Sequence, residues 1–175
     1  SAGDILSLRS EFPVEEFYIM APQATNFTWY PHSFLAPIQQ NEPWLTSAVD
    51  LINDIVITIN NSGIASDKIW LLGFSQGACL TLEYASRNAR KWGGVIAFTG
   101  GLIGDKIYTE NYKGDFRGTK VFIGNSDKDP HVPRVRSEES SRVLKTLGAD
   151  VKLKIYPGLS HTINQDEIET VKKMF

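Results

Sequence analysis

Short runs of apolar residues alternate with longer segments of helical periodicity along most of this chain. Continuous apolar strands joined by amphipathic helices are typical of a parallel sheet that is covered by helices on both faces. We therefore predict a mostly parallel α/β sheet whose strands lie at 17–20, 68–72, 94–98, 120–123 and 151–156. The predicted helices lie at 5–12, between Pro43 and the turn 60–63 with Asn41 as a cap, at 76–90, at 133–147, and around 168–174.

The totals fit one domain that spans residues 1–175, with 42% apolar and 22% charged residues. The formal net charge is −2 and no basic patch is visible, which argues against a nucleic-acid partner. Cys79 is the only cysteine, so no internal disulfide can form, and we expect a cytoplasmic protein. No apolar run approaches the roughly 18 residues of a transmembrane helix, and no signal peptide is visible. The chain begins at Ser1, so we expect its true start to lie upstream.

One serine stands between two glycines where the apolar run 68–72 gives way to a predicted helix. The segment Gly73-Phe74-Ser75-Gln76-Gly77 has the strand, tight turn and helix that expose a serine nucleophile. The positive end of the helix dipole would face Ser75, and the Gln76 amide could donate a hydrogen bond to a developing oxyanion. The alternative is an ordinary turn serine.

A nucleophilic serine needs a base, and histidine is the usual one. Of the three histidines, His161 follows the strand 151–156, where the carboxyl edge of the sheet should lie. His32 lies in an aromatic loop and His131 lies beside the candidate acid, so we favour His161 as the base. The alternative is a loop histidine with a structural hydrogen bond.

The carboxylate that orients the base should also follow a strand. Asp127 and Asp129 both lie just after the strand 120–123, and we favour Asp129, which precedes Pro130 and so marks a sharp, extended turn. Asp127 is the alternative acid, or a turn residue that binds its own backbone. The chain order Ser75, Asp129, His161 differs from the orders of the two classical serine protease families.

The segments GFSQGACL, SDKDPHVP and YPGLSHTI resemble the phospholipase/carboxylesterase family of α/β-hydrolases, which includes the acyl-protein thioesterases. The resemblance covers most of the chain and implies an α/β-hydrolase fold, with Ser75 as nucleophile, Asp129 as acid and His161 as base. It also implies a small hydrolase of esters or thioesters. In that family a strand beside the nucleophile strand ends in a His-Gly-rich loop, which supplies the second oxyanion amide. Neither that strand nor that loop is found in the sequence, so we expect them upstream and name no second donor.

The leading hypothesis is a serine carboxylesterase that works through an acyl-enzyme, needs no metal or other cofactor, and takes a small ester or thioester substrate. A thioesterase or lysophospholipase for long acyl chains is the alternative within enzymes. A non-catalytic binding protein on the same fold is the alternative of another class. A homodimer is left open.

Residues 22–43 contain no predicted element but several aromatic side chains, namely Phe27, Trp29, Tyr30 and Phe34. Long loops of this kind are often functional. We expect Trp29 and Tyr30, together with Phe74 beside the serine, to bind the acyl or alcohol group of the substrate. The alternative is that the rings only anchor the loop to the domain.

Overall fold

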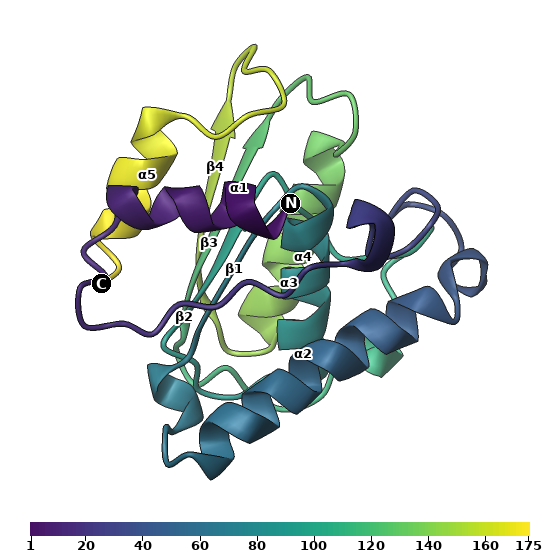
Figure 1. Cartoon of the computed structure of the whole chain (residues 1–175). Helices are drawn as coiled ribbons and strands as arrows, with labels where there is room; N and C mark the ends of the chain where they lie inside the picture. Colours follow the sequence, from purple (N-terminus) through teal and green to yellow (C-terminus); the bar gives the residue numbers. More distant parts are fainter.

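The computed structural model describes residues 1–175 and contains one parallel sheet of four strands in the order β1-β2-β3-β4 (Figure 1). The strands are β1 (Trp70–Phe74), β2 (Gly94–Phe98), β3 (Lys120–Ser126) and β4 (Asp150–Tyr156). Trp70 pairs with Gly94, Val95 with Val121, and Val121 with Val151, so the strands lie in a continuous register. The parallel sheet expected from the apolar runs is therefore present.

Five α-helices and five short 3-10 turns connect and cover the strands. The α-helices are α1 (Ala2–Ser7), α2 (Trp44–Asn61), α3 (Gln76–Arg87), α4 (Arg134–Thr146) and α5 (Gln165–Lys172). The 3-10 turns are Leu8–Glu11, Thr25–Phe27, Ile38–Asn41, Ser66–Lys68 and Thr109–Asn111.

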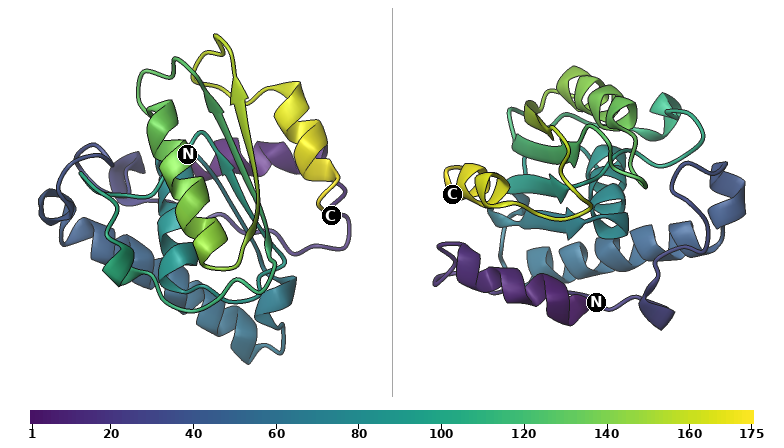
Figure 2. Two further views of the ribbon diagram at one scale, coloured as in Figure 1. Left: turned by 180° about the vertical axis from the view of Figure 1, so that it is seen from behind. Right: turned by 90° about the horizontal axis from the view of Figure 1, so that it is seen from above.

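The two faces of the sheet are buried against different helices, because successive side chains of a strand point to opposite faces. Val95 and Ala97 belong to the larger core, which α2, α3 and α4 complete. Ile96 and Phe98 belong to a smaller core with Ile168 of α5 and the segment 12–14. The view from above in Figure 2 shows α3 and α5 on opposite sides of the sheet. This double cover explains why β2 is buried at every position.

The segment 17–20 is not the buried strand that its apolar composition predicts. It contains no strand, and Tyr18 is 96% exposed. Phe17 contacts the ring of Trp70 in β1, with 6.5 Å between ring centroids, but no ladder joins the two segments. An apolar segment becomes a strand only where a neighbouring backbone is within pairing distance, and this segment has none.

The start of α2 also differs from the prediction. The helix begins at Trp44, and the side chain that accepts a hydrogen bond from its first turn is that of Glu42, which binds the Thr46 amide at 3.0 Å. Asn41 is buried and instead binds the His32 amide and the Ser33 carbonyl. Its amide group therefore fixes the preceding loop and does not cap the helix.

Candidate active site

Ser75 lies in the sharp turn between β1 and α3, with φ 55° and ψ −122°. A residue other than glycine in this left-handed region costs of order 1–3 kcal/mol, and such strain persists only where the surroundings impose it. Here they do, because the Ser75 N–H donates to the Phe98 carbonyl at 3.0 Å and the Ser75 carbonyl accepts from Cys79 at 3.0 Å. The turn is thus fixed to β2 on one side and to α3 on the other.

The two glycines beside this turn are not equivalent. A Cβ atom at Gly73 would overlap the backbone of Gly77 and Ala78, so only glycine allows β1 and α3 to approach this closely. A Cβ atom at Gly77 would meet no atom within 4 Å. The close packing of strand on helix therefore depends on the first glycine, while the second lines an open groove.

The structure brings Ser75, Asp129 and His161 together from three separate loops at the carboxyl edge of the sheet. His161 Nε2 lies 2.8 Å from Ser75 Oγ, and His161 Nδ1 lies 2.7 Å from Asp129 Oδ2. An ionised carboxylate can only accept, so Nδ1 bears the imidazole proton and Nε2 is left free to accept the serine hydroxyl proton. This is the arrangement that a general base for Ser75 requires.

The Asp129 side chain is fully buried, and its two oxygens are both engaged. Oδ1 accepts hydrogen bonds from the amides of His131 at 2.9 Å and Val132 at 2.8 Å, and Oδ2 faces His161. Burial by itself raises the pKa of Asp129, but these hydrogen bonds and the imidazole outweigh burial, so the pKa is lowered. The carboxylate is therefore ionised at neutral pH, as the tautomer of His161 requires.

Asp127, the alternative acid, does not face the imidazole. Its Oδ1 accepts the Gly158 amide at 2.7 Å, and its own amide donates to the Tyr156 carbonyl at 3.2 Å. Asp127 therefore ties the loop that contains His161 to the end of β3, a contact that was not foreseen from the sequence.

The other two histidines occupy different positions. His131 lies edge-on to His161, with 4.9 Å between ring centroids, and His32 is an exposed loop residue far along the chain from both candidate acids. The ring of Phe74, the residue before Ser75, also packs against the His161 ring, with 5.0 Å between ring centroids. Phe74 thus contacts the candidate base as well as lining the groove described next.

A groove of about 660 Å³ opens beside Ser75 and runs along the outer edge of β1. Its lining is mostly apolar and comes from β1, α1, α2, α3 and the loop 20–29. Phe27 and Trp29 line it, and Phe27 is 76% exposed. Trp29 and Phe74 are therefore placed where the sequence predicted substrate contacts.

Tyr30 is not placed there. It is only 2% exposed, belongs to the larger core, and does not line the groove. In this bent segment Trp29 lines the groove while its neighbour Tyr30 enters the core. Tyr30 anchors the aromatic loop, which corrects its predicted role in substrate binding.

The side chain of Gln76 holds this loop against the serine turn. Its Oε1 accepts the Trp29 amide at 2.8 Å, and its Nε2 donates to the Tyr30 carbonyl at 2.9 Å and to Thr28 Oγ1 at 3.2 Å. The sequence indicated only a role for the Gln76 backbone amide. The only sequence signal for the role of the Gln76 side chain in holding the loop is the position of Gln76 next to Ser75.

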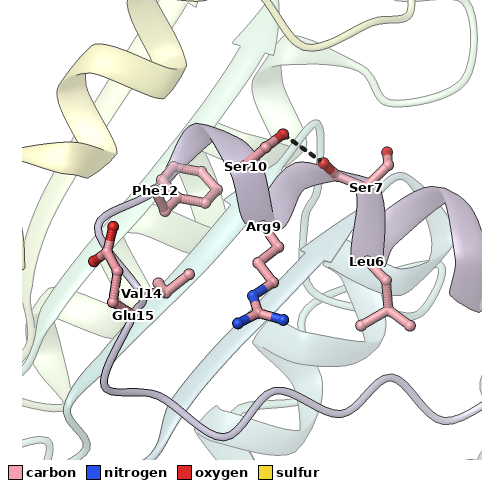
Figure 3. A pocket seen from close by; sticks show the side chains of 7 residues that line it. All are labelled: Leu6, Ser7, Arg9, Ser10, Phe12, Val14 and Glu15. Carbon is pink, nitrogen blue, oxygen red and sulfur yellow. Dashed lines mark hydrogen bonds between the residues drawn. The ribbon is translucent and has the colours of Figure 1, made fainter.

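A smaller hollow of about 410 Å³ lies where α1 and the turn after it meet the segment 12–15 (Figure 3). It shares no residue with the groove beside Ser75. The dashed line in Figure 3 is the hydrogen bond from Ser10 Oγ to the Ser7 carbonyl at 3.2 Å, a contact within the helical turn. Nothing in this hollow resembles the constellation around Ser75.

No group of three or more His, Cys, Asp or Glu side chains is placed to hold a metal ion. None of the helices combines the length and the apolar character that crossing a bilayer requires.

Comparison with known proteins decides the family. The family model described as phospholipase/carboxylesterase matches residues 13–175. This chain belongs to the phospholipase/carboxylesterase family. Among curated relatives, acyl-protein thioesterase 1 of Gibberella zeae is 34% identical over 114 residues, which are 64% of this chain and 48% of the relative. The probable carboxylesterase SOBER1-like of Arabidopsis thaliana is 26% identical over 74% of this chain and 50% of its own length. The chain thus spans about half the length of the curated relatives it matches.

Solved structures of the family superpose closely. The crystal structure of a phospholipase/carboxylesterase from Dyadobacter fermentans is 53% identical with a TM-score of 0.97, over 99% of this chain and 83% of that one. Arabidopsis SOBER1 has a TM-score of 0.80 at 18% identity, over 99% of this chain and 91% of that one. The second likeness shows the fold alone. Membership of the family makes this chain a relative of hydrolases of the carboxylesterase and phospholipase class.

Proposed function

We propose that this chain contains the catalytic machinery of a serine hydrolase that cleaves carboxylic esters through an acyl-enzyme. Ser75 Oγ attacks the acyl carbonyl, His161 takes the hydroxyl proton on Nε2, and Asp129 holds the imidazole in the tautomer that can accept it. His161 then gives the proton to the leaving alcohol, and water releases the acyl group by the reverse sequence. The observation that supports this most is the continuous chain of short contacts from Asp129 through His161 to Ser75.

The Gln76 amide is proposed as one oxyanion donor. It is the first N–H of α3, and the first amides of a helix have no acceptor within the helix. It is also at the positive end of the helix dipole, directly after the nucleophile.

The test of the whole proposal is hydrolysis of a chromogenic short-chain ester by the chain, compared with its Ser75→Ala variant.

A thioesterase or lysophospholipase activity on longer acyl chains is the second candidate. The similarity to acyl-protein thioesterase 1 favours it, as does the apolar lining at the end of the groove near Trp29 and Ser75. The chemistry at Ser75 would be the same, and only the leaving group and the acyl length would differ. A non-catalytic binding protein would show no ester turnover above background, with or without Ser75.

We expect Trp29→Ala to raise KM, or to change the preference between short and longer acyl esters, with little change in melting temperature. The reason is that an acyl chain packed on Trp29 gains about 0.8 kcal/mol for each methylene removed from water. Steady-state kinetics with esters of two acyl lengths and a thermal melt check this. Tyr30→Ala is the matched control, because its buried ring should lower the melting temperature instead. If Trp29→Ala lowers the melting temperature and leaves the acyl preference unchanged, the ring is an anchor and the pocket assignment is wrong.

We further propose that the outer edge of β1 pairs with another strand, whose following loop supplies the second oxyanion donor. Gly93 donates to the Ile69 carbonyl and Ser75 donates to the Phe98 carbonyl, so the odd-numbered residues of β1 face β2. In a parallel ladder alternate residues face opposite edges, which leaves the N–H and C=O groups of Trp70, Leu72 and Phe74 toward the groove. Unpaired backbone groups in such a groove are costly, and a strand satisfies them where an acyl chain cannot. The acyl site is assigned to the end of the groove near Trp29 and Ser75.

This strand proposal predicts a pattern of amide exchange. In this chain the amides of Leu72 and Phe74 should exchange with solvent deuterium much faster than those of Leu71 and Gly73, because only the latter face β2. In a chain extended at its N-terminus so that it includes the proposed pairing strand, all four should be protected. Residue-resolved hydrogen exchange by NMR measures this. Fast exchange at Leu72 and Phe74 in the extended chain would contradict a pairing strand.

A further inference from the structure

Glu167 is a fully buried carboxylic acid that the proposed reaction does not use. It is the third residue of α5, and its exposed fraction is 0%. Its Oε2 accepts the Asn164 amide at 2.9 Å, while Asn164 Oδ1 accepts the Glu167 amide at 3.0 Å. This reciprocal capping box satisfies two amides at the start of the helix. Here the second carboxyl oxygen, Oε1, is buried without any hydrogen-bond partner.

The unpartnered oxygen lies against the backbone of β3. A Cβ atom at Gly124 would overlap Glu167 Oε1, so a larger residue at this point of the strand would displace the carboxyl group from its present position. The Gly124 carbonyl accepts a hydrogen bond from the Thr99 amide at 2.8 Å, and β3 ends two residues later, at Ser126. The loop that contains Asp129 begins there. Glu167 therefore contacts the base of the segment that presents the candidate acid.

Glu167 also contacts Asn164, which lies close in sequence to the candidate base, His161. Asn164, which Glu167 binds, is the third residue after His161, in a loop without regular structure between β4 and α5. The beginning of this loop is held by the bond from the Gly158 amide to Asp127. Only one main-chain bond lies wholly inside it, from Thr162 to the Ser160 carbonyl. The position of His161 thus depends on anchors at its two ends, and Glu167 is the anchor at the second end.

We propose that Glu167 is a positioning residue for the proposed reaction: by fixing Asn164 against Gly124, it sets the place of His161 relative to Asp129. The inference rests on the proposed function. It explains why a carboxyl group is buried at a cost where an exposed cap would serve the helix equally well. A purely structural role in starting α5 is the alternative.

The buried surroundings of Glu167 disfavour the ionised form of its carboxyl group. Burial raises the pKa of Glu167 to about 7, against the lowering effect of the Asn164 amide; among the neighbouring charges Asp166 raises it and Lys154 lowers it. The hydroxyl of Tyr156, in β4 like Lys154, donates to Asp166 Oδ2 at 2.7 Å. The pKa of Glu167 is higher in the folded chain than in the unfolded chain, so the folded chain keeps this proton to a higher pH. The contribution of Glu167 to stability therefore falls as pH rises from about 4.5 to about 7. Replacement by glutamine should remove this dependence.

The test compares Glu167→Met, which fills the volume but cannot accept the Asn164 amide, with Glu167→Gln, which can. We expect Glu167→Met to lower kcat by up to about 100-fold, the cost of misplacing a catalytic group by about 1 Å, with KM little changed. Glu167→Gln should restore kcat to near the starting value. Glu169→Met is the matched control, because Glu169 is exposed on the same helix and should leave kcat and KM unchanged. A kcat in Glu167→Met equal to that of the control would overturn the proposal, as would a loss in Glu167→Gln as large as in Glu167→Met.

A second readout does not depend on turnover. The proton on His161 Nδ1, donated to Asp129, should give a far-downfield NMR resonance that is absent in His161→Ala. We expect this resonance to shift or broaden in Glu167→Met, and also in Asn164→Ala, which keeps the backbone amide bound by Glu167 but removes the reciprocal bond from the Glu167 amide to Asn164 Oδ1. An unchanged resonance in both variants would overturn the positioning role even if the chain has no esterase activity. If Glu167→Met does not fold, Asn164→Ala tests the same capping box through its other bond, with the glutamate in place.

Discussion

Replacing Ser75 or His161 by alanine is expected to lower the turnover number for a chromogenic short-chain ester by about four to six orders of magnitude, because the members of a triad act as a unit. Without Ser75 Oγ there is no acyl acceptor, and without His161 Nε2 no group within hydrogen-bond distance can take the hydroxyl proton. The double variant should be no worse than either single one. Steady-state kinetics with a sensitive ester measure all three.

The controls for these variants are Ser10→Ala and His32→Ala, since both residues are exposed and lie outside the constellation at Ser75. They should retain the turnover number of the parent chain. A Ser75→Ala variant with the full turnover number would refute the proposed mechanism, because the nucleophile would then lie elsewhere.

Asp129→Asn is expected to lower the turnover number by about four orders of magnitude, the loss seen when the orienting carboxylate of a triad becomes an amide. An amide that donates to Nδ1 would move the imidazole proton to Nε2, where it cannot accept from Ser75. Asp127→Asn should stay close to the parent chain, because its side-chain oxygen can still accept the Gly158 amide. Parallel kinetics of the two variants decide between the carboxylates. If Asp127→Asn is the more damaging change, the acid has been assigned wrongly.

Much of the sheet could be predicted from the sequence because its strands are short, continuous apolar runs. In a chain with amphipathic helices, such runs favour the interior of a parallel sheet. The runs at 94–98 and 120–123 became β2 and most of β3, buried on both faces. The last strand, at 150–156, is an edge strand that pairs with β3 alone, as its alternating pattern suggests.

The segment 17–20 shows why composition alone is insufficient. Its four residues are as apolar as those of β2, yet they are exposed, because strand formation needs a partner backbone and apolar character does not provide one. The pattern of apolar residues indicates which side chains a segment would bury. It does not indicate whether another strand is available to pair with that segment.

The candidate site could be foreseen because its three side chains each follow a strand. The carboxyl ends of parallel strands meet at one edge, so the pattern of strand followed by Ser75, Asp129 or His161 already indicates proximity. The supporting contacts could not be foreseen, since they join residues by the exact course of loops. Neither the bond from Gly158 to Asp127 nor the burial of Glu167 has a periodic signature in the sequence.

The most direct test of the central claim is covalent labelling by a serine-directed organophosphonate, followed by peptide mass spectrometry. An activated serine attacks the phosphorus atom, displaces the leaving group of the reagent and keeps the phosphonyl group, while ordinary serine hydroxyls do not react. The proposed mechanism predicts a single adduct on the peptide that contains Ser75, none in Ser75→Ala, and strongly slowed labelling in His161→Ala. An adduct that forms equally in Ser75→Ala, or labelling of Ser75 that is unaffected by loss of His161, would contradict it.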